Sequence, residues 1–220
     1  MLLAVDTSTA QVGLALYDGA RVVGEFAWRS AQRHTVELAP AISDLLTRCG
    51  TAMDDIQALG IALGPGSFTS LRVGLALVKG LAVARHIPLI GVPTLDILAH
   101  AQPASRLPLL CAIQAGRGRF ALGAYKSSRK GWQAQGPGRV VNLEALMAEA
   151  ADPCLVCGEF SAEDIQKMKD ENIRLASPAA SVRRPAVLAE LAWMRWQAGE
   201  VDDEASLAPI YLHTEGSPPA

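Results

Sequence analysis

The chain opens with Leu2-Leu3-Ala4-Val5-Asp6-Thr7-Ser8-Thr9-Ala10-Gln11-Val12-Gly13-Leu14-Ala15-Leu16-Tyr17, and a similar pattern returns halfway along it. An apolar run followed by a polar turn and an alternating segment predicts a β-hairpin. A shift of 108 residues, without a gap, places Leu2–Asp6 on Leu110–Gln114. The same shift pairs Val12, Leu14 and Tyr17 with Phe120, Leu122 and Tyr125. We interpret the repeat as two related lobes, although two unrelated hairpins would also look alike.

Helical and strand-like segments follow each hairpin, which predicts an α/β fold with a mixed sheet and helices in each lobe. We expect a first lobe over residues 1–104, a second over 105–212 and a flexible tail over 213–220. Residues 126–139 are rich in Lys, Ser and Gly and predict a loop or a loose hairpin. We expect helices over 35–49, 69–85, 94–102, 143–150, 161–170 and 185–198, and strands over 22–28, 58–63, 89–92, 154–157 and 172–175.

Composition excludes several classes of protein. Half of the 220 residues are hydrophobic and 19% are charged, which excludes intrinsic disorder. The net charge of −2 provides no basic excess to drive nucleic-acid binding by counterion release alone. No segment approaches the roughly 20 apolar residues of a membrane span, and no signal peptide is visible, so we expect a cytoplasmic protein. Aromatic residues make up only 5%, which predicts a core of small, closely packed side chains.

Two loops have the composition of phosphate-binding sites. Asp6, Thr7 and Ser8 place a carboxylate beside hydroxyls, and the carboxylate could hold a phosphate-bound Mg²⁺. The loop Gly64-Pro65-Gly66-Ser67 lies between a buried strand and a helix, where backbone N–H groups can bind an anion. An ordinary turn is the favoured interpretation of the first loop taken alone, and composition does not separate a turn from an anion site in the second. By the ungapped repeat, the counterpart of Asp6 is Gln114, which cannot supply a second charge.

The predicted helix over residues 69–85 is apolar on several faces. Such a helix needs a sheet on one side and another apolar surface on the other. A partner protein could provide that surface, and burial within the monomer is an equal alternative. Gly74 and Gly80 suit a close approach of another element to the helix.

Metal and nucleophile motifs are weak. Cys154 and Cys157 have redox spacing but read as parts of a buried strand, and no two histidines have metal-ligand spacing. His34 could touch a ligand or a partner, or cap a helix at the surface. The basic pairs Arg183-Arg184 and Arg117-x-Arg119 could touch RNA phosphates, although such pairs usually belong to the solvated surface. We therefore assign no catalytic residue and no metal site.

The segment Gly64-Pro65-Gly66-Ser67-Phe68-Thr69-Ser70-Leu71-Arg72-Val73-Gly74, together with Asp6-Thr7-Ser8, resembles the TsaB (YeaZ) family. The family pattern Gly-Pro-Gly-Ser-Phe-Thr-Gly-Leu-Arg-Ile-Gly is matched at nine of eleven positions. The resemblance extends over residues 1–212 and is weaker in the second half. Gln114 and His213 stand where the family often has Asp and Arg, so no role of those residues is carried over.

The resemblance implies a two-lobed, actin-like or sugar-kinase-like (ASKHA) fold. It also implies a non-catalytic scaffold in the synthesis of threonylcarbamoyladenosine next to the tRNA anticodon. The partners would be a catalytic paralogue, TsaD, and an ATPase, TsaE, with a homodimer in isolation and only indirect contact with tRNA. ATP and Mg²⁺ would bind only in the complex. An active ATPase or phosphotransferase is the alternative, and a peptidase is a weaker one. Docking would use the helices near residues 35–49 and 69–85. The expected interface residues are Leu38, Ile42, Leu45, Leu71, Leu75 and Val78.

Overall fold

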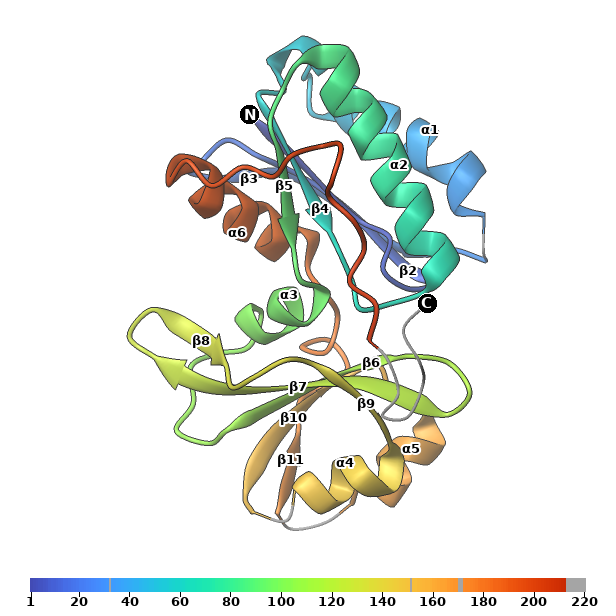
Figure 1. The fold of residues 1–220 in the computed structure, drawn as a ribbon, viewed down its shortest axis with the longest axis vertical. Coiled ribbons are helices and arrows are strands. Elements are labelled where there is room, and N and C mark those ends of the chain that lie inside the picture. The colour runs from blue at the N-terminus through green and yellow to red at the C-terminus, as the bar shows by residue number, and fades with distance from the viewer. Residues whose placement is uncertain (32, 151, 170–171, 213–220) are drawn as a thin grey trace. The chain divides into compact units, whose positions relative to one another are not determined.

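The computed structural model describes residues 1–31, 33–150, 152–169 and 172–212 and divides the chain into two units (Figure 1). Unit 1 comprises Met1–Ile97 and Arg183–Ile210, and unit 2 comprises Leu98–Val182 with the chain from Tyr211. We expected the second lobe to extend to residue 212, and this was wrong. Residues 183–210 belong to unit 1 because their helix packs on the first sheet. The expected tail, 213–220, lies outside the described residues.

Unit 1 is a five-stranded sheet in the order β3-β2-β1-β4-β5, with helices on both faces. β1 pairs antiparallel with β2 and parallel with β4. The elements are β1 (Leu2–Asp6), β2 (Gln11–Tyr17), β3 (Val22–Arg29), α1 (His34–Arg48), a 3-10 turn (Met53–Asp55), β4 (Ala58–Ala62), α2 (Phe68–Arg85), β5 (Leu89–Val92) and α6 (Pro185–Gln197). The helix α3 (Thr94–His100) follows β5 and spans the boundary between the units.

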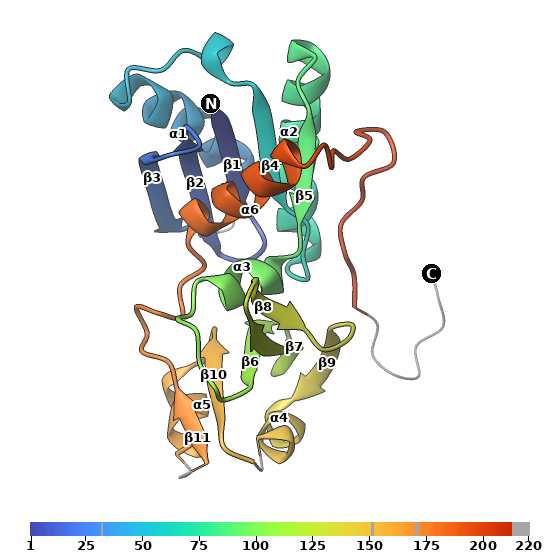
Figure 2. The same cartoon turned by 90° about the vertical axis from the view of Figure 1, so that its left-hand side faces the viewer.

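The two faces of the first sheet have cores of different character. Leu3 and Val5 face α1 and α2 in a core of larger aliphatic side chains. Leu2 and Ala4 face α6, whose Ala192 belongs to a core rich in alanine. Figure 2 shows α6 crossing the sheet face opposite to α2. The alanine-rich side confirms the expected core of small, closely packed residues.

Unit 2 repeats the topology of unit 1. Its sheet has the order β11-β10-β6-β7-β8, and β9 also pairs with β7. The strands β9, β7, β6, β10 and β11 therefore correspond to β3, β2, β1, β4 and β5. The elements are β6 (Leu109–Gln114), β7 (Arg119–Ser128), β8 (Gly131–Ala134), β9 (Arg139–Asn142), α4 (Leu143–Glu149), β10 (Cys154–Gly158), α5 (Ala162–Lys167) and β11 (Ile173–Leu175).

The register corrects the ungapped repeat. Leu3 pairs with Leu16 in unit 1 and Leu110 pairs with Ala124 in unit 2, so the two hairpins differ by one residue in register. Leu3 and Leu14 face the core under α1 and α2, and Leu110 and Leu122 face the core under α4 and α5, so the first strands align with a shift of 107 and the second strands with 108. One extra residue lies in the turn of the second hairpin. The counterpart of Asp6 is therefore Ile113 rather than Gln114, and it lacks a carboxylate as well.

Candidate functional site

The residues predicted for a phosphate site meet at one edge of the first sheet. The Asp6–Thr9 loop follows β1, Gly64 and its neighbours follow β4, and Thr94 follows β5. These three strands are parallel, so their carboxyl ends share one edge, where ligands bind in α/β sheets. The Ser67 N–H donates to the Ser8 carbonyl at 2.6 Å and joins two of the loops.

Asp6 is held by a buried arginine that the sequence analysis left at the surface. The Nε of Arg183 lies 2.8 Å from Oδ2 of Asp6, and the two side chains are only 1% and 4% exposed. Arg183 also donates from Nη2 to Oγ1 of Thr9 at 2.9 Å and to the Gln11 carbonyl at 3.0 Å. The other Asp6 oxygen accepts the Ser8 N–H at 2.8 Å. Both carboxylate oxygens are therefore bonded within unit 1.

This arrangement does not fit Mg²⁺-ATP. In a metal site, the Asp6 carboxylate would coordinate a hydrated divalent cation. Here the Arg183 guanidinium provides the positive charge in that position. A metal ion there would meet an arginine cation in an environment that excludes water, where repulsion between like charges is strong.

The hydroxyl groups of the same loop also bond within the protein. Thr7 donates to the Ser70 carbonyl at 2.9 Å. The hydroxyl oxygens of Ser8 and Thr94 lie 2.7 Å apart, and Thr94 Oγ1 accepts the Gly64 N–H at 2.8 Å. All three side chains that follow β1 and β5 in this network are buried. The hydroxyls thus connect the strand ends to each other.

Two glycines bring the start of α2 against the hairpin loop. A Cβ on Gly66 would collide with the Ser8 carbonyl, and a Cβ on Gly74 would collide with the Thr7 side chain. The hydroxyl of Ser67 caps the helix by accepting from the Ser70 N–H. The loop and the Ser67 hydroxyl thus accept two of the N–H groups at the start of α2, those of Ser67 and Ser70, which an anion at a helix N-terminus would otherwise use.

His34 of α1 packs against the Asp6–Thr9 loop. It begins α1, is 5% exposed, and its Nε2 lies 3.1 Å from the Thr9 carbonyl. The expectation of a surface cap was therefore wrong, because the ring is buried against the loop, and a contact with a ligand or a partner stays a prediction.

Arg183 is the residue that sequence analysis missed. It is 177 positions from Asp6, and the adjacent Arg184 pairs with Glu25 at 3.0 Å, so neither arginine is a free surface cation. The sequence gives one weak sign. The pair stands directly before Pro185, which begins α6, and the residue before a proline is restricted to extended conformations.

The six predicted interface residues are all buried in unit 1. Each is between 0% and 6% exposed, and five of them belong to the aliphatic core between α1, α2 and the sheet. This prediction was wrong because the buried stripes of α1 and α2 were assigned to the partner. The residues concerned are Leu38, Ile42, Leu45, Leu71, Leu75 and Val78.

The cysteines form no metal centre. Cys157 lies beside Cys111 of β6 rather than Cys154, with the two sulfur atoms 3.5 Å apart and no disulfide between them. Burial raises the pKa of the Cys154 thiol, and nearby Asp152 adds to the effect. Across the described part of the chain, no three His, Cys, Asp or Glu side chains are grouped to hold a metal ion. Nor is any helix in that part long and apolar enough to cross a membrane.

Comparisons with known proteins relate the chain to proteins named for threonylcarbamoyl modification of tRNA. Residues 25–181 match the family described as TsaD: tRNA N6-adenosine threonylcarbamoyltransferase. The tRNA threonylcarbamoyladenosine biosynthesis protein TsaB of Escherichia coli is 34% identical over 148 residues, covering 66% of this chain and 64% of that protein. The protein of the same name from Bacillus subtilis is 38% identical over 98 residues, covering 44% and 43%. The chain thus aligns with less than two thirds of each of these relatives.

Solved structures agree over nearly the whole chain. YeaZ from Pseudomonas aeruginosa superposes with a TM-score of 0.79 at 28% identity, covering 96% of this chain and 99% of the other. The ethanolamine utilization protein EutJ of Carboxydothermus hydrogenoformans has a TM-score of 0.51 at 12% identity and indicates the fold alone. The two-lobed actin-like fold is therefore confirmed.

Proposed function

Because the chain matches the family described as TsaD and belongs to the TsaB (YeaZ) proteins, we propose that it is a non-catalytic scaffold subunit in threonylcarbamoyladenosine synthesis on tRNA. It would act with a TsaD-like transferase and a TsaE-like ATPase, in the cytoplasm where tRNA is modified. It binds no nucleotide on its own, and ATP with Mg²⁺ enters only in the complex.

The observation that carries the proposal is the buried pair of Asp6 and Arg183. An actin-like ATPase needs a carboxylate that is free to position Mg²⁺ and phosphate. Here that carboxylate neutralises an arginine, and the loop hydroxyls join protein groups. This argues against the alternative of an ATPase or a phosphotransferase and leaves a supporting role for the chain.

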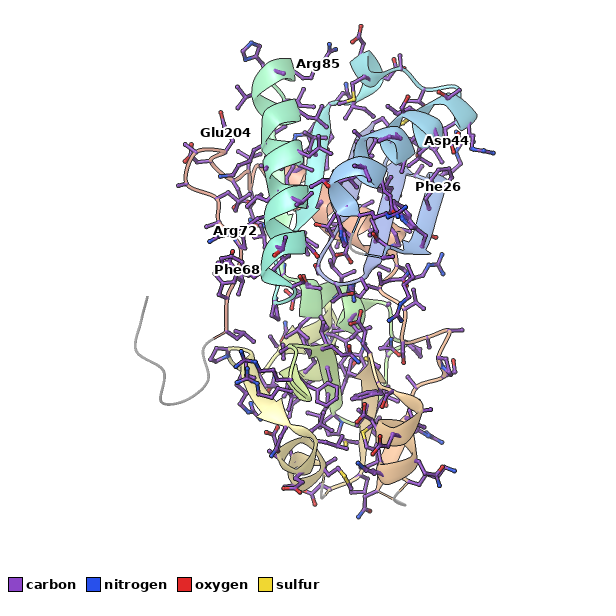
Figure 3. The ribbon with its side chains drawn as sticks, turned by 90° about the vertical axis from the view of Figure 1, so that its right-hand side faces the viewer. Phe26, Asp44, Phe68, Arg72, Arg85 and Glu204 are labelled. Atoms are coloured by element: carbon purple, nitrogen blue, oxygen red, sulfur yellow. The ribbon has the colours of Figure 1, made fainter. Side chains whose placement is uncertain are left out.

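The outer face of α1 and α2 supports docking on a partner. Val36 of α1 is 65% exposed, and Phe68 and Val83 of α2 are 54% and 55% exposed. The guanidinium of Arg72 lies 3.6 Å from the centre of the Phe68 ring. Figure 3 shows Phe68 and Arg72 near one end of α2 and Arg85 at the other. We place the interface on this exposed face instead of the buried one.

Co-purification with TsaD-like and TsaE-like proteins tests the proposal. We expect Phe68→Asp and Val83→Asp to weaken the complex at least tenfold while the chain stays folded, because both side chains already face solvent. The matched control is Met194→Asp, since Met194 is 59% exposed on α6, across the sheet. Loss of the complex with the control and retention with Val83→Asp would place the interface on α6. No complex for the wild type would overturn the function.

A further inference from the structure

Unit 2 has an element that its repeat partner lacks. β2 ends at Tyr17, and its counterpart Tyr125 lies inside β7, which continues to Ser128. The chain then turns and returns as β8 before β9 takes the position that β3 holds in unit 1. Figure 1 shows this hairpin in yellow-green. The β7–β8 extension is therefore an addition to the repeated topology.

The added hairpin lies in an acid-free part of the chain. Residues 97–143 contain none of the 22 acidic residues but seven of the 20 Lys and Arg residues. The net charge of −2 thus conceals a strongly basic segment of 47 residues. Such a concentration of one charge creates a local field that attracts polyanions.

Four of these cations gather at one end of the second sheet. Arg106 and Lys126 line one groove of about 410 Å³ together with the hydroxyl-bearing Ser105 and Ser127. Arg129 and Lys130 form the tip of the hairpin, because Ser128 pairs with Gly131 on either side of them. All four cations are exposed, and none has an ion pair with an acid in the described chain. We call Arg106, Lys126, Arg129 and Lys130 the basic hairpin surface.

The hairpin holds three of these charges, Lys126, Arg129 and Lys130, on a fixed support, and Arg106 lies in the segment before β6. Trp132 of β8 is 5% exposed, and its Nε1 donates to the Gln102 carbonyl at 3.1 Å. Tyr125 is buried at 3% on the neighbouring strand. Cations on a rigid support lose less conformational freedom when they bind a ligand.

We propose that the basic hairpin surface binds the phosphate backbone of RNA and that the RNA is the tRNA of the proposed function, on which this inference rests. Arginine, lysine and serine side chains are the usual donors to backbone phosphates. An anionic membrane fits less well, because four cations contribute only about 1 kcal/mol each at a lipid surface and stable binding also draws on apolar side chains. Within residues 98–182, no large apolar side chain of the described chain is exposed, and Trp132 is turned inward.

Binding of fluorescently labelled tRNA to the full chain, without partners, tests this inference. Four phosphate contacts predict that affinity falls about 50- to 150-fold between about 50 and 200 mM salt. In the test variant, all four cations of the basic hairpin surface become Gln. The control variant changes Arg29, Arg33, Lys169 and Arg174 to Gln, which are also exposed and remove the same charge. We expect the test variant to reduce the salt slope by about 3. We expect the control to reduce the slope by less than about 1.

Equal loss of tRNA affinity in both variants would overturn the inference, because it would show a general charge effect. So would wild-type binding to phosphatidylserine vesicles without binding to tRNA. The outcome is independent of the scaffold test. A chain that binds tRNA through this surface but forms no complex refutes the function alone. A chain that forms the complex but binds no tRNA refutes this inference alone.

Discussion

Arg183 determines what the phosphate-type loop of this chain can do. Its side chain reaches the Asp6 carboxylate across 177 positions and is buried almost completely. A buried charge without its partner is costly, because the protein interior solvates it poorly. The ion pair therefore holds the Asp6–Thr9 loop in a conformation in which both oxygens of the Asp6 carboxylate are bonded within the protein.

Removal of one member of this pair should destabilise the protein strongly. We expect Arg183→Met to lower the free energy of unfolding by about 3–5 kcal/mol, since it leaves Asp6 as an uncompensated buried charge. The double variant Asp6→Asn with Arg183→Met should recover most of the loss. Urea denaturation of both variants measures this. A single variant as stable as the wild type would show that the pair contributes nothing to the fold.

Of the two residues in this ion pair, Asp6 was predicted to belong to a site and Arg183 was not. Asp6–Ser8 and Gly64–Ser67 were predicted as two loops of phosphate-binding composition, and the structure brings them together because each follows a parallel strand. Nothing in the local pattern around Arg183 predicts its partner, because an ion pair between distant segments has no periodic signal. The position of the loop was predictable from the sequence, but the ion pair that occupies the Asp6 carboxylate was not.

At the scale of elements, α2 is apolar on all sides, so its sequence does not indicate which face is buried. Its predicted range of 69–85 agrees closely with Phe68–Arg85, and the helix ends where His86 takes a left-handed conformation. Its faces were assigned wrongly, because apolar residues occur on the buried and on the exposed side. Gly74 approaches the Thr7 side chain as expected, whereas nothing lies within 4 Å of a Cβ on Gly80.

The two glycines of α2 should therefore respond in opposite ways to alanine. Gly74→Ala forces a methyl group into the buried, β-branched Thr7 and should cost about 1–3 kcal/mol by overpacking. Gly80→Ala meets open space and should stabilise the helix by up to about 1 kcal/mol. Thermal unfolding midpoints compare the two. If Gly80→Ala were the more harmful, another element would have to pack there in the free protein.

A second element, α6, depends on a carboxylate from β3. Glu25 accepts the backbone N–H of Ala186 at 3.1 Å at the start of α6 and pairs with Arg184. Burial alone would raise the pKa of Glu25, but the hydrogen bonds from Arg184 and Ala186 outweigh it and hold the pKa below the ordinary 4.5. A lowered pKa in the folded state means that stability is gained above the ordinary value and lost as pH falls through the lowered one.

Glu25→Gln should therefore reduce stability only where the carboxylate is charged. We expect a loss of about 1 kcal/mol at pH 7, from the charge at the helix N-terminus and the ion pair. The difference from the wild type should shrink as the pH falls below 4.5. Urea titrations at a series of pH values measure this. A difference that stays constant down to pH 3 would rule out the carboxylate charge as its cause.

At the scale of the whole molecule, duplication explains the architecture. The two sheets share one strand order, and the repeat was readable because both hairpins have the same alternation. The boundary near residue 182 was not readable, since α6 returns to the first sheet late in the chain through alanines that carry no distinctive pattern. The low aromatic content fits this close packing of α6, because small residues such as Gly60 and Ala192 let the helix lie close to the sheet.

Net charge also has a different meaning at this scale. A value of −2 argued against a chain that grips RNA through basic excess alone. The acid-free segment in unit 2 shows that the charges are distributed unevenly, so a weak overall charge is compatible with one basic surface.

The most direct test of the scaffold is threonylcarbamoyl transfer to tRNA, reconstituted with TsaD-like and TsaE-like partners and the Asp6→Asn, Arg183→Met double variant of this chain. We expect the double variant, once shown to fold and to join the complex, to support the wild-type rate, because the Asp6–Thr9 loop takes no part in the chemistry. A rate reduced tenfold or more in an intact complex would contradict it and assign a chemical role to Asp6 or Arg183.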